Sequence, residues 1–422
     1  YGIPLSALIA RDATNLYLAG RDISATHAAL GTMRVMGTTA LMGQAVGTAA
    51  AIAHGAASST DEPVSARLSE TNISELQRRL VRDDVWLPNT EPQDPEDKAK
   101  LASVTASGQF RYRGVEPGER GIAEARGMLH ERIRPGFLTR VETRMAQLVA
   151  TDGSLEKLRL WIENSAGEPR VAALSLSICD GIHDYTVTSD DRVIARTTME
   201  IPDRIVGWTI WELDEESRRR VLEYAKDSGG PPYLRLELER DPDLVWHHAR
   251  TCAPGLPAMY QVSEERMRRL HHGLSLAFGV EPAQAAYPPE HAIGTVARPS
   301  KATNLWLSGT ETPAWLALVW ETPQTISEVR LTFPGNILRE YHAYGPGYVA
   351  PETAKRYDLQ VQGSSRPGLA AGNWLTVCSV DNNYQRHRIH RLESCQNITS
   401  LRVLIHETNG AGSAGLYQVR VY

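Results

Sequence analysis

The sequence predicts a multidomain, mostly β protein in which a short α/β segment and a helical linker precede two jelly-roll-like β-sandwiches. Three observations support this fold class. Residues 1–59 follow the order strand, loop and helix, and residues 60–100 contain one amphipathic helix and a stretch rich in proline and charge. From residue 101 onward, apolar and polar residues alternate with a period of two. We therefore expect four parts, covering residues 1–59, 60–100, 101–286 and 287–422.

The first part is expected to form a strand, a loop and a helix. The stretch "NLYLAG" predicts a short apolar strand that ends at Gly20, and "RVMGTTALMGQAVGTAAAIA" predicts the helix. This order places backbone N–H groups and the positive end of the helix dipole beside the loop "GRDIS", where they favour an anion. Gly43 and Gly47 lie four residues apart and would let another backbone approach the helix closely.

The second part is predicted to contain a helix within "SETNISELQRRLVRDD". Asn72 or Ser74 is the expected N-cap, and Ile73, Leu76 and Leu80 share one face. The following "WLPNTEPQDPEDKAK" holds three prolines and many charges, and we expect it to be a linker.

Strands of the two sandwiches are predicted by alternation between turn residues. The expected strand regions of the first sandwich are 157–179, 192–201, 206–214 and 231–241. Those of the second are 314–333, 356–365, 373–380, 385–392, 400–408 and 415–422. Each sandwich is long enough to hold its own core.

Composition excludes several classes of function. The net charge is -5 and the arginines are scattered, so no nucleic-acid footprint is expected. No run of about 18 apolar residues predicts a membrane span. The four cysteines form no metal-ligand pattern and no metal site is expected; Cys378 and Cys395 could pair if their strands are adjacent, but we expect buried free thiols.

At its N-terminus the sequence resembles the FAD-dependent oxidoreductases, in which a two-dinucleotide-binding-type FAD domain ends in a related signature. The resemblance rests on Ile3-Pro4, Leu8, Asn15-Leu16, Ala19-Gly20-Arg21, Ile23-Ser24, Thr26-His27, Arg34, Met36, Gly43-Gln44-Ala45 and Gly47. It implies that these residues are the last strand and helix of the FAD domain. The Gly-rich GxGxxG strand-turn-helix that holds the pyrophosphate is not in this sequence, so we expect a missing N-terminal FAD-binding portion and an incomplete FAD site.

The resemblance implies roles for individual residues. The flavin-binding residues would be Gly20, Arg21, Asp22, Ser24, Thr38, Thr39 and Gly43. His27 would be the catalytic acid or base, or would only order its loop through hydrogen bonds. Arg34 would steady charge at the flavin or substrate, or would pair with Asp22. Asp22 could bind ribityl hydroxyls, or simply form a turn.

The final part resembles discoidin-type, galactose-binding-like jelly rolls in "ATNLWLSGTETPAWLALVWETPQTISEVRLTF" and the closing "LYQVRVY". This resemblance implies carbohydrate binding through aromatic rings that stack on sugar faces. The candidates are Trp306, Trp315, Tyr341 and Tyr344; the alternative for each is a place in the core.

Together these features predict the C-terminal portion of a FAD-dependent oxidoreductase, inactive by itself, that removes hydride from a hydroxylated and possibly carbohydrate substrate. Two alternatives remain: a non-catalytic carbohydrate-binding protein, and a polysaccharide lyase or hydrolase with its site in the first sandwich. The discoidin-like part favours an extracytoplasmic location, either periplasmic or secreted.

Overall fold

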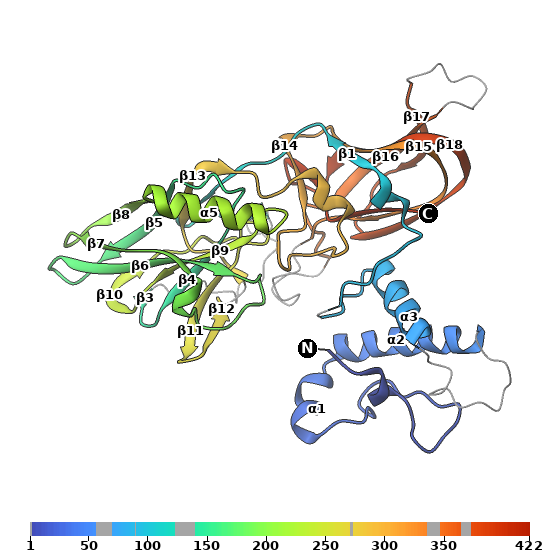
Figure 1. Ribbon diagram of the computed structural model, residues 1–422, viewed down its shortest axis with the longest axis horizontal. Coiled ribbons are helices and arrows are strands. Elements are labelled where there is room, and N and C mark those ends of the chain that lie inside the picture. Colours follow the sequence, from blue (N-terminus) through green and yellow to red (C-terminus); the bar gives the residue numbers. More distant parts are fainter. Residues whose placement is uncertain are drawn as a thin grey trace. The chain divides into compact units, whose positions relative to one another are not determined.

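The computed structural model describes residues 2–55, 70–88, 90–122, 140–270, 273–335, 347–363 and 373–422 (Figure 1). The chain divides into two compact units, residues 1–97 and 98–422, which are described in turn. Among the described residues, the regular secondary structure of the first unit is helical apart from one bridge, and that of the second unit is mostly β-strand.

The described part of the first unit contains four helical elements: η1 (Leu5–Leu8), α1 (His27–Met33), α2 (Met36–Gly55) and α3 (Glu70–Arg82). The strand predicted at residues 15–20 is wrong. Residues Ile9 and Tyr17 form only an isolated antiparallel bridge, flanked by a hydrogen bond from the Leu18 N–H to the Leu8 carbonyl (2.9 Å). Within the described part of this unit, no neighbouring strand extends the ladder on the other side.

Two small apolar clusters hold α2 in place. Leu8, Ile23 and Met42 are buried together near the start of the helix. Near its end, Ala49 and Ile52 pack with Leu76 and Leu80 of α3. Leu76 and Leu80 thus face inward as predicted, although α3 begins at Glu70, before the expected N-cap residues.

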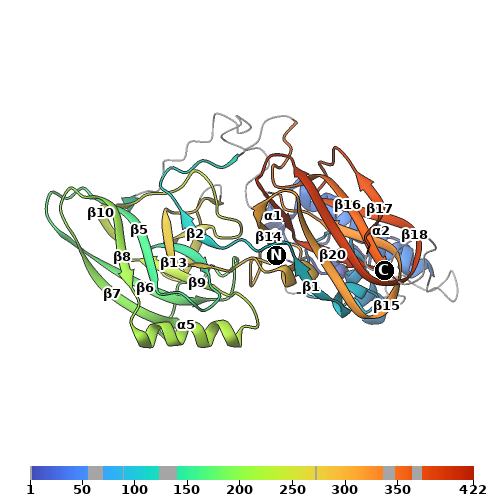
Figure 2. The same cartoon turned by 90° about the horizontal axis from the view of Figure 1, so that it is seen from above.

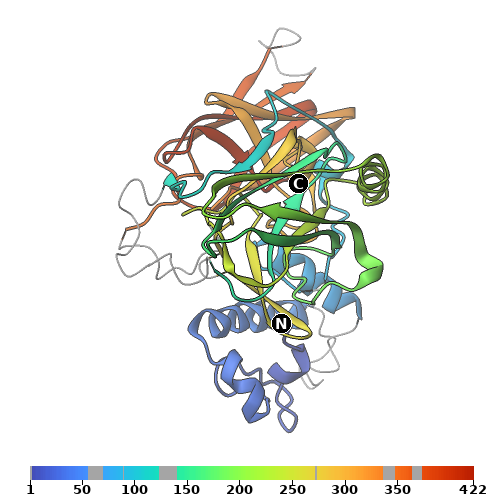
Figure 3. The ribbon, with the colours of Figure 1, turned by 90° about the vertical axis from the view of Figure 1, so that its left-hand side faces the viewer.

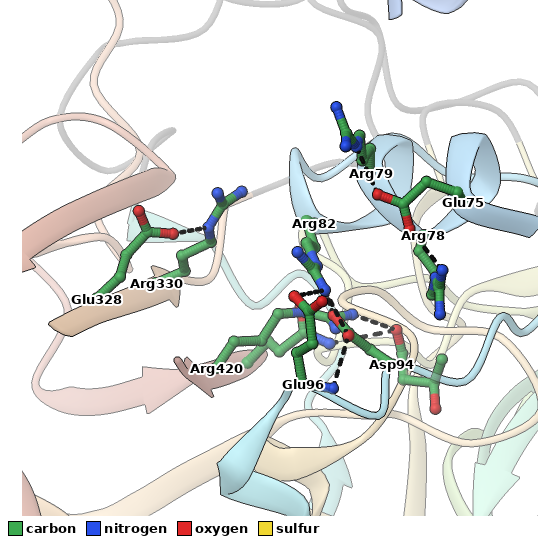
Figure 4. Close-up of polar contacts among 11 residues, drawn as sticks. Glu75, Arg78, Arg79, Arg82, Asp94, Glu96, Glu328, Arg330 and Arg420 are labelled. Atoms are coloured by element: carbon green, nitrogen blue, oxygen red, sulfur yellow. Dashed lines mark hydrogen bonds and ion pairs between the residues drawn. The ribbon is translucent and has the colours of Figure 1, made fainter. Parts of the chain in front are cut away.

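The segment that follows α3 is tied back to it. Arg82 donates two hydrogen bonds of 2.6 Å to the two carboxylate oxygens of Asp94, and a third of 2.8 Å to Glu96 (Figure 4). The Asp94 side chain is 3% exposed, and bidentate guanidinium–carboxylate pairs fix both partners in orientation. The stretch predicted to be a linker therefore has a buried anchor.

In the second unit, residues 98–422, the first sandwich consists of two antiparallel sheets. One has the order β2 (Tyr112–Val115), β13 (Phe278–Gln284), β5 (Lys157–Asn164), β10 (Asp241–Trp246) and β3 (Arg140–Val141), with β8 (Val206–Glu212) also paired to β5. The other has the order β12 (Arg266–Arg269), β11 (Ala258–Ser263), β4 (Met145–Ala150), β9 (Tyr233–Leu238), β6 (Arg170–Cys179) and β7 (Val193–Ile201).

Alternation builds the core of this sandwich. On β5, Leu158, Leu160 and Ile162 are buried while the residues between them are partly exposed. Helix α5 (Glu215–Asp227), seen nearly end-on in Figure 3, begins where the Asp214 carboxylate accepts a hydrogen bond from the Ser217 N–H (2.7 Å). Its Val221 is fully buried in the same core.

The second sandwich has a core of its own. Its main sheet has the order β1 (Ser103–Ala106), β15 (Ala314–Thr332), β18 (His387–Thr408), β16 (Ala354–Gly363) and β17 (Leu375–Val380), and β20 (Gln418–Val421) also pairs with β15. Figure 2 labels β15, β16, β17, β18 and β20 of this main sheet. A separate two-stranded sheet is formed by β14 (Trp306–Glu311) and β19 (Ser413–Leu416). The short 3-10 helices of this unit are η2 (Lys98–Leu101), η3 (Asp190–Arg192) and η5 (Pro289–Ile293).

One strand departs from the predicted division at residue 101. Strand β1 was expected in the first sandwich, yet Ser103 to Ala106 pair with Val319 to Leu316 of β15 in the second. Strand β2, only six residues later, pairs with β13 of the first sandwich. The chain therefore crosses between the sandwiches at residues 107–111, because its alternating pattern suits the edge of either sheet.

Candidate functional site

The loop of residues 20–24 is anchored by one buried apolar side chain, that of Ile23. Ile23 is 7% exposed and packs with Leu8 and Met42, while the Ser24 N–H donates to the Ala7 carbonyl (3.0 Å). Gly20 has φ +127°, a conformation that side chains rarely adopt. This loop is consequently held against η1 and α2 with its polar side chains directed outward.

Helices α1 and α2 meet at a sharp bend beside this loop. Thr26 caps α1 by accepting a hydrogen bond from the Ala29 N–H (3.3 Å), and the Thr39 N–H bonds the Val35 carbonyl (3.0 Å) as α2 begins. The two helix axes differ by 92°. The first turn of the 20-residue α2, which includes Thr38, therefore directs N–H groups and the positive end of the helix dipole toward the bend.

The polar side chains of the predicted site are accessible. Arg21, Asp22, Ser24, His27 and Arg34 are all exposed. Within residues 2–55 the ion pair that the structure shows is Arg11–Asp12, not one between Arg34 and Asp22. His27 makes no side-chain hydrogen bond within the described residues, so the alternative in which it orders its loop finds no support there. These groups are available to a ligand.

The glycines of α2 face open space. A Cβ atom added at Gly43 or Gly47 would meet no atom of the described chain within 4 Å, so the predicted close approach of a second backbone is not made by these residues. Met36 and Leu41 nearby are 85% and 48% exposed. This part of α2 is a surface of small and apolar residues.

Of the four predicted sugar-binding aromatics, the structure describes Trp306 and Trp315. Trp306 is fully buried in the second core, and its Nε1–H donates to the Gly108 carbonyl (3.0 Å), so this prediction is corrected. A tryptophan at an inward position of β14 has no face left for a sugar. Trp315 is half-buried. Tyr341 and Tyr344 lie outside the described residues.

The described residues contain neither a cluster of metal ligands nor a disulfide bond. No group of three or more His, Cys, Asp or Glu side chains among them could hold a metal ion. The four cysteines are free, and Cys179 and Cys395 are buried as expected. His247 instead pairs with Glu163 (2.8 Å) across the outer face of the first sandwich.

A pocket of about 320 Å³ lies within the second unit, between the two sandwiches. Phe110 and Tyr112 line it from the first sandwich, and Leu307, Pro334 and Glu352 from the second. The sequence did not predict this pocket, because its walls come from several stretches that are far apart in the chain and carry no common motif.

Comparisons with known proteins support the flavin resemblance over the first unit. Residues 1–80 match the family described as FAD dependent oxidoreductase. No curated protein matches the chain. Among the described residues, no single helix is long and apolar enough to cross a membrane, although the bent pair of α1 and α2 meets that test by length and composition.

The chain is also similar to solved carbohydrate-binding and discoidin-like modules. One is chitosan-binding module 2 of a Paenibacillus sp. IK-5 chitosanase/glucanase, in complex with chitotriose, at 20% identity, 33% of this chain, 88% of that chain and a TM-score of 0.25. A second is the family 32 carbohydrate-binding module of Streptococcus pneumoniae EndoD, at 15% identity, with 28% of this chain and 75% of that chain covered and a TM-score of 0.22. A third is an F5/8 type C domain from Bacteroides fragilis, at 14% identity, with 33% of this chain and 82% of that chain covered and a TM-score of 0.24.

The residues present fit one side of FAD. The left-handed Gly20, the outward polar loop and the start of α2 offer a glycine-lined approach and N–H donors suited to the negatively charged end of a reduced flavin. The described residues offer no Gly-rich strand-turn-helix for the pyrophosphate. The described residues therefore offer groups for one side of the cofactor only.

Proposed function

We propose that this chain supplies the flavin-facing C-terminal segment of a FAD-dependent oxidoreductase and joins it to two β-sandwiches. The observation that carries the proposal is the open polar surface at the bend between α1 and α2, which lies inside the residues that match the flavoenzyme family.

Each group on this surface has a defined task in the proposal. FAD, when bound, supplies the hydride acceptor. The exposed imidazole of His27 takes the hydroxyl proton of the substrate, and the Arg34 guanidinium steadies the negative charge that develops nearby. Gly20, Arg21, Asp22 and Ser24 hold the ribityl and phosphate region, and the start of α2 with Thr38 and Thr39 faces the ring end. Gly43 leaves room for a second backbone.

The proposal requires a second half of the cofactor site. A Gly-rich strand-turn-helix must bind the pyrophosphate, and we infer that an N-terminal FAD-binding portion outside this sequence provides it. The 422 residues alone should therefore bind FAD weakly and turn over no substrate. We further propose a hydroxylated, carbohydrate-like substrate and an extracytoplasmic site of action.

A pair of matched histidine variants tests the catalytic assignment. In the protein isolated from its source, His27→Ala should keep the flavin content and lower kcat by about 10²- to 10⁴-fold, and its pH profile should lose one limb. His54, exposed in the last turn of α2, provides the control, and His54→Ala should leave both quantities unchanged. Equal kcat values for the two variants would remove His27 from the mechanism.

The rival proposal is a non-catalytic carbohydrate-binding protein. After the correction of Trp306, the described aromatic that supports it is Trp315, which is half-buried on β15. Glycan binding by protein that contains no flavin after isolation, and that loses the glycan on Trp315→Ala, would favour this rival. Release of unsaturated or reducing ends from a polysaccharide would instead favour a lyase or hydrolase.

A further inference from the structure

We propose that the pocket between the two sandwiches binds a small, uncharged, hydroxylated ring compound through the carboxyl group of Glu352. The pocket belongs wholly to the second unit and does not involve the flavin-facing surface, so the inference stands independently of the proposed oxidoreductase activity. Its volume of about 320 Å³ lies at the lower end of the range of roughly 300–1,000 Å³ that is typical of small-molecule sites.

The buried carboxyl group is the first reason to expect a ligand. Glu352 lines the pocket, and its Oε2 atom is inaccessible to solvent and has no hydrogen-bond partner in the described structure. Burial raises the pKa of this carboxyl group above its usual value, and the only opposing contact is the residue's own backbone N–H. A buried polar atom left unpaired costs about 1–3 kcal/mol, so a rotation of the Glu352 side chain that brings this oxygen to a ligand hydroxyl in the pocket would recover free energy.

The walls explain why the ligand should carry a ring. Phe110 and Tyr112 contribute aromatic surface from the first sandwich, and Leu307 and Pro334 contribute apolar surface from the second. Tyr112 itself is held rigidly, because its hydroxyl donates to the Ala150 carbonyl. Such walls suit the apolar faces of a compound whose polar groups project from its edge.

The exposed rim explains why the ligand should be uncharged. Glu119 and Arg120 both line the pocket and are exposed, so they place charges of opposite sign at its edge. The carboxylate of Glu119 is already engaged by the Glu116 N–H (2.9 Å). A cationic ligand would meet Arg120, and an anionic ligand would meet Glu119 and Glu352, whereas hydroxyl groups can bond to each of them.

Gly412 offers a way to close the pocket without disturbing the fold. It lines the pocket, is exposed, and a Cβ atom added to it would meet nothing within 4 Å. Its carbonyl accepts a hydrogen bond from the Thr312 N–H (3.3 Å), which a substitution would preserve. Gly412→Phe should therefore fill the space while the thermal midpoint of the chain stays the same.

The experiment is saturation-transfer NMR and calorimetric titration of the purified chain with four probes: methyl β-D-glucopyranoside, methyl β-D-galactopyranoside, cyclohexylamine and benzoate. We expect at least one glycoside to bind and the two charged probes not to bind. Glu352→Gln should weaken the glycoside about tenfold, Gly412→Phe should abolish its binding, and Glu321→Gln, at an exposed position of the same sandwich, should have no effect.

Three outcomes would overturn the inference. Failure of both glycosides to bind would mean that solvent alone fills the pocket. Binding of a charged probe without either glycoside would contradict the ligand class. Glycoside binding that survives Gly412→Phe in a folded protein would place the sugar elsewhere. A melting curve for each variant separates loss of binding from loss of structure.

Discussion

Helix α2 of the first unit and strand β14 of the second sandwich both contain large apolar residues and glycines, but several of these residues are exposed on α2, whereas Trp306 and Gly309 are closely packed on β14. On α2, Met36 is 85% exposed and the helix rests on two small clusters. On β14, Trp306 is fully buried within a continuous core. The difference shows that the described chain buries the side chain of Trp306 but leaves that of Met36 open to solvent, as the proposed cofactor-facing surface requires.

Glycine shows the same contrast. A Cβ atom at Gly309 in β14 would lie 2.5 Å from the Gln109 carbonyl oxygen, so this glycine is required by the close passage of another segment. A Cβ atom at Gly43 in α2 would meet nothing within 4 Å. A glycine in the middle of a helix costs about 0.5–1 kcal/mol relative to alanine, and at Gly43 the described structure shows no compensating contact.

The largest effect in this comparison is expected for Trp306→Ala. Removing a fully buried tryptophan and its hydrogen bond should lower the free energy of unfolding of the second sandwich by about 3–5 kcal/mol. Denaturant titration of the chain, followed by tryptophan fluorescence, would measure it. A loss below about 1 kcal/mol would mean that Trp306 is not part of the core.

Acid should destabilise the second sandwich next most strongly. Burial lowers the pKa of His291 and of His390 to about 4, and His390 lies between the Tyr357 hydroxyl (3.0 Å) and the Cys378 thiol (3.5 Å). A depressed histidine pKa means that the unfolded chain binds the proton first. Stability is therefore present above about pH 6.5 and declines as the pH falls toward 4, by roughly 2–3 kcal/mol per histidine.

Replacing His390 tests this prediction. His390→Gln cannot be protonated, so its free energy of unfolding should change less between pH 7 and pH 4 than that of the wild type. His54→Gln, at an exposed position in the first unit, serves as the control. Identical pH dependence in all three proteins would show that His390 does not titrate in this way.

The smallest predicted effect is a stabilisation, whereas the changes described above destabilise the protein. Gly43→Ala should stabilise the first unit by up to about 1 kcal/mol, because alanine favours the helix and the position is open. Gly309→Ala, at φ +68° and against a neighbouring backbone, should destabilise the second sandwich by more than 1 kcal/mol. Circular dichroism during urea unfolding compares them, and destabilisation by both variants would mean that α2 has a packing partner.

The sequence predicted the second unit better than the first. Alternation identified β5 to β9 of the first sandwich and most strands of the second, but it missed β2 to β4 and β10 to β13 of the first. It failed for β1, whose four residues suit either sheet, and for Trp306, because period-two alternation does not say which face is inward.

In the first unit, the loop "GRDIS" and the helix after it were predicted correctly from the sequence, but the strand "NLYLAG" was not. Residues 15–20 form only a bridge, because their pairing with the preceding segment is limited to Ile9 and Tyr17. Gly20 has a positive φ and the side chains of His27 and Arg34 are exposed, but nothing tests their predicted roles and these residues remain a proposed site. The pocket at Glu352 could not be predicted, because its parts meet only in the folded chain.

The absorption spectrum of the protein isolated from its source tests the central claim most directly. The account predicts flavin bands in the wild type, their loss in Gly20→Val, and their retention in Gly167→Val, which changes a glycine of similarly positive φ in a turn of the first sandwich. Wild-type protein that contains no flavin even after saturation with FAD, or a Gly20→Val variant with undiminished flavin, would contradict the assignment of this surface.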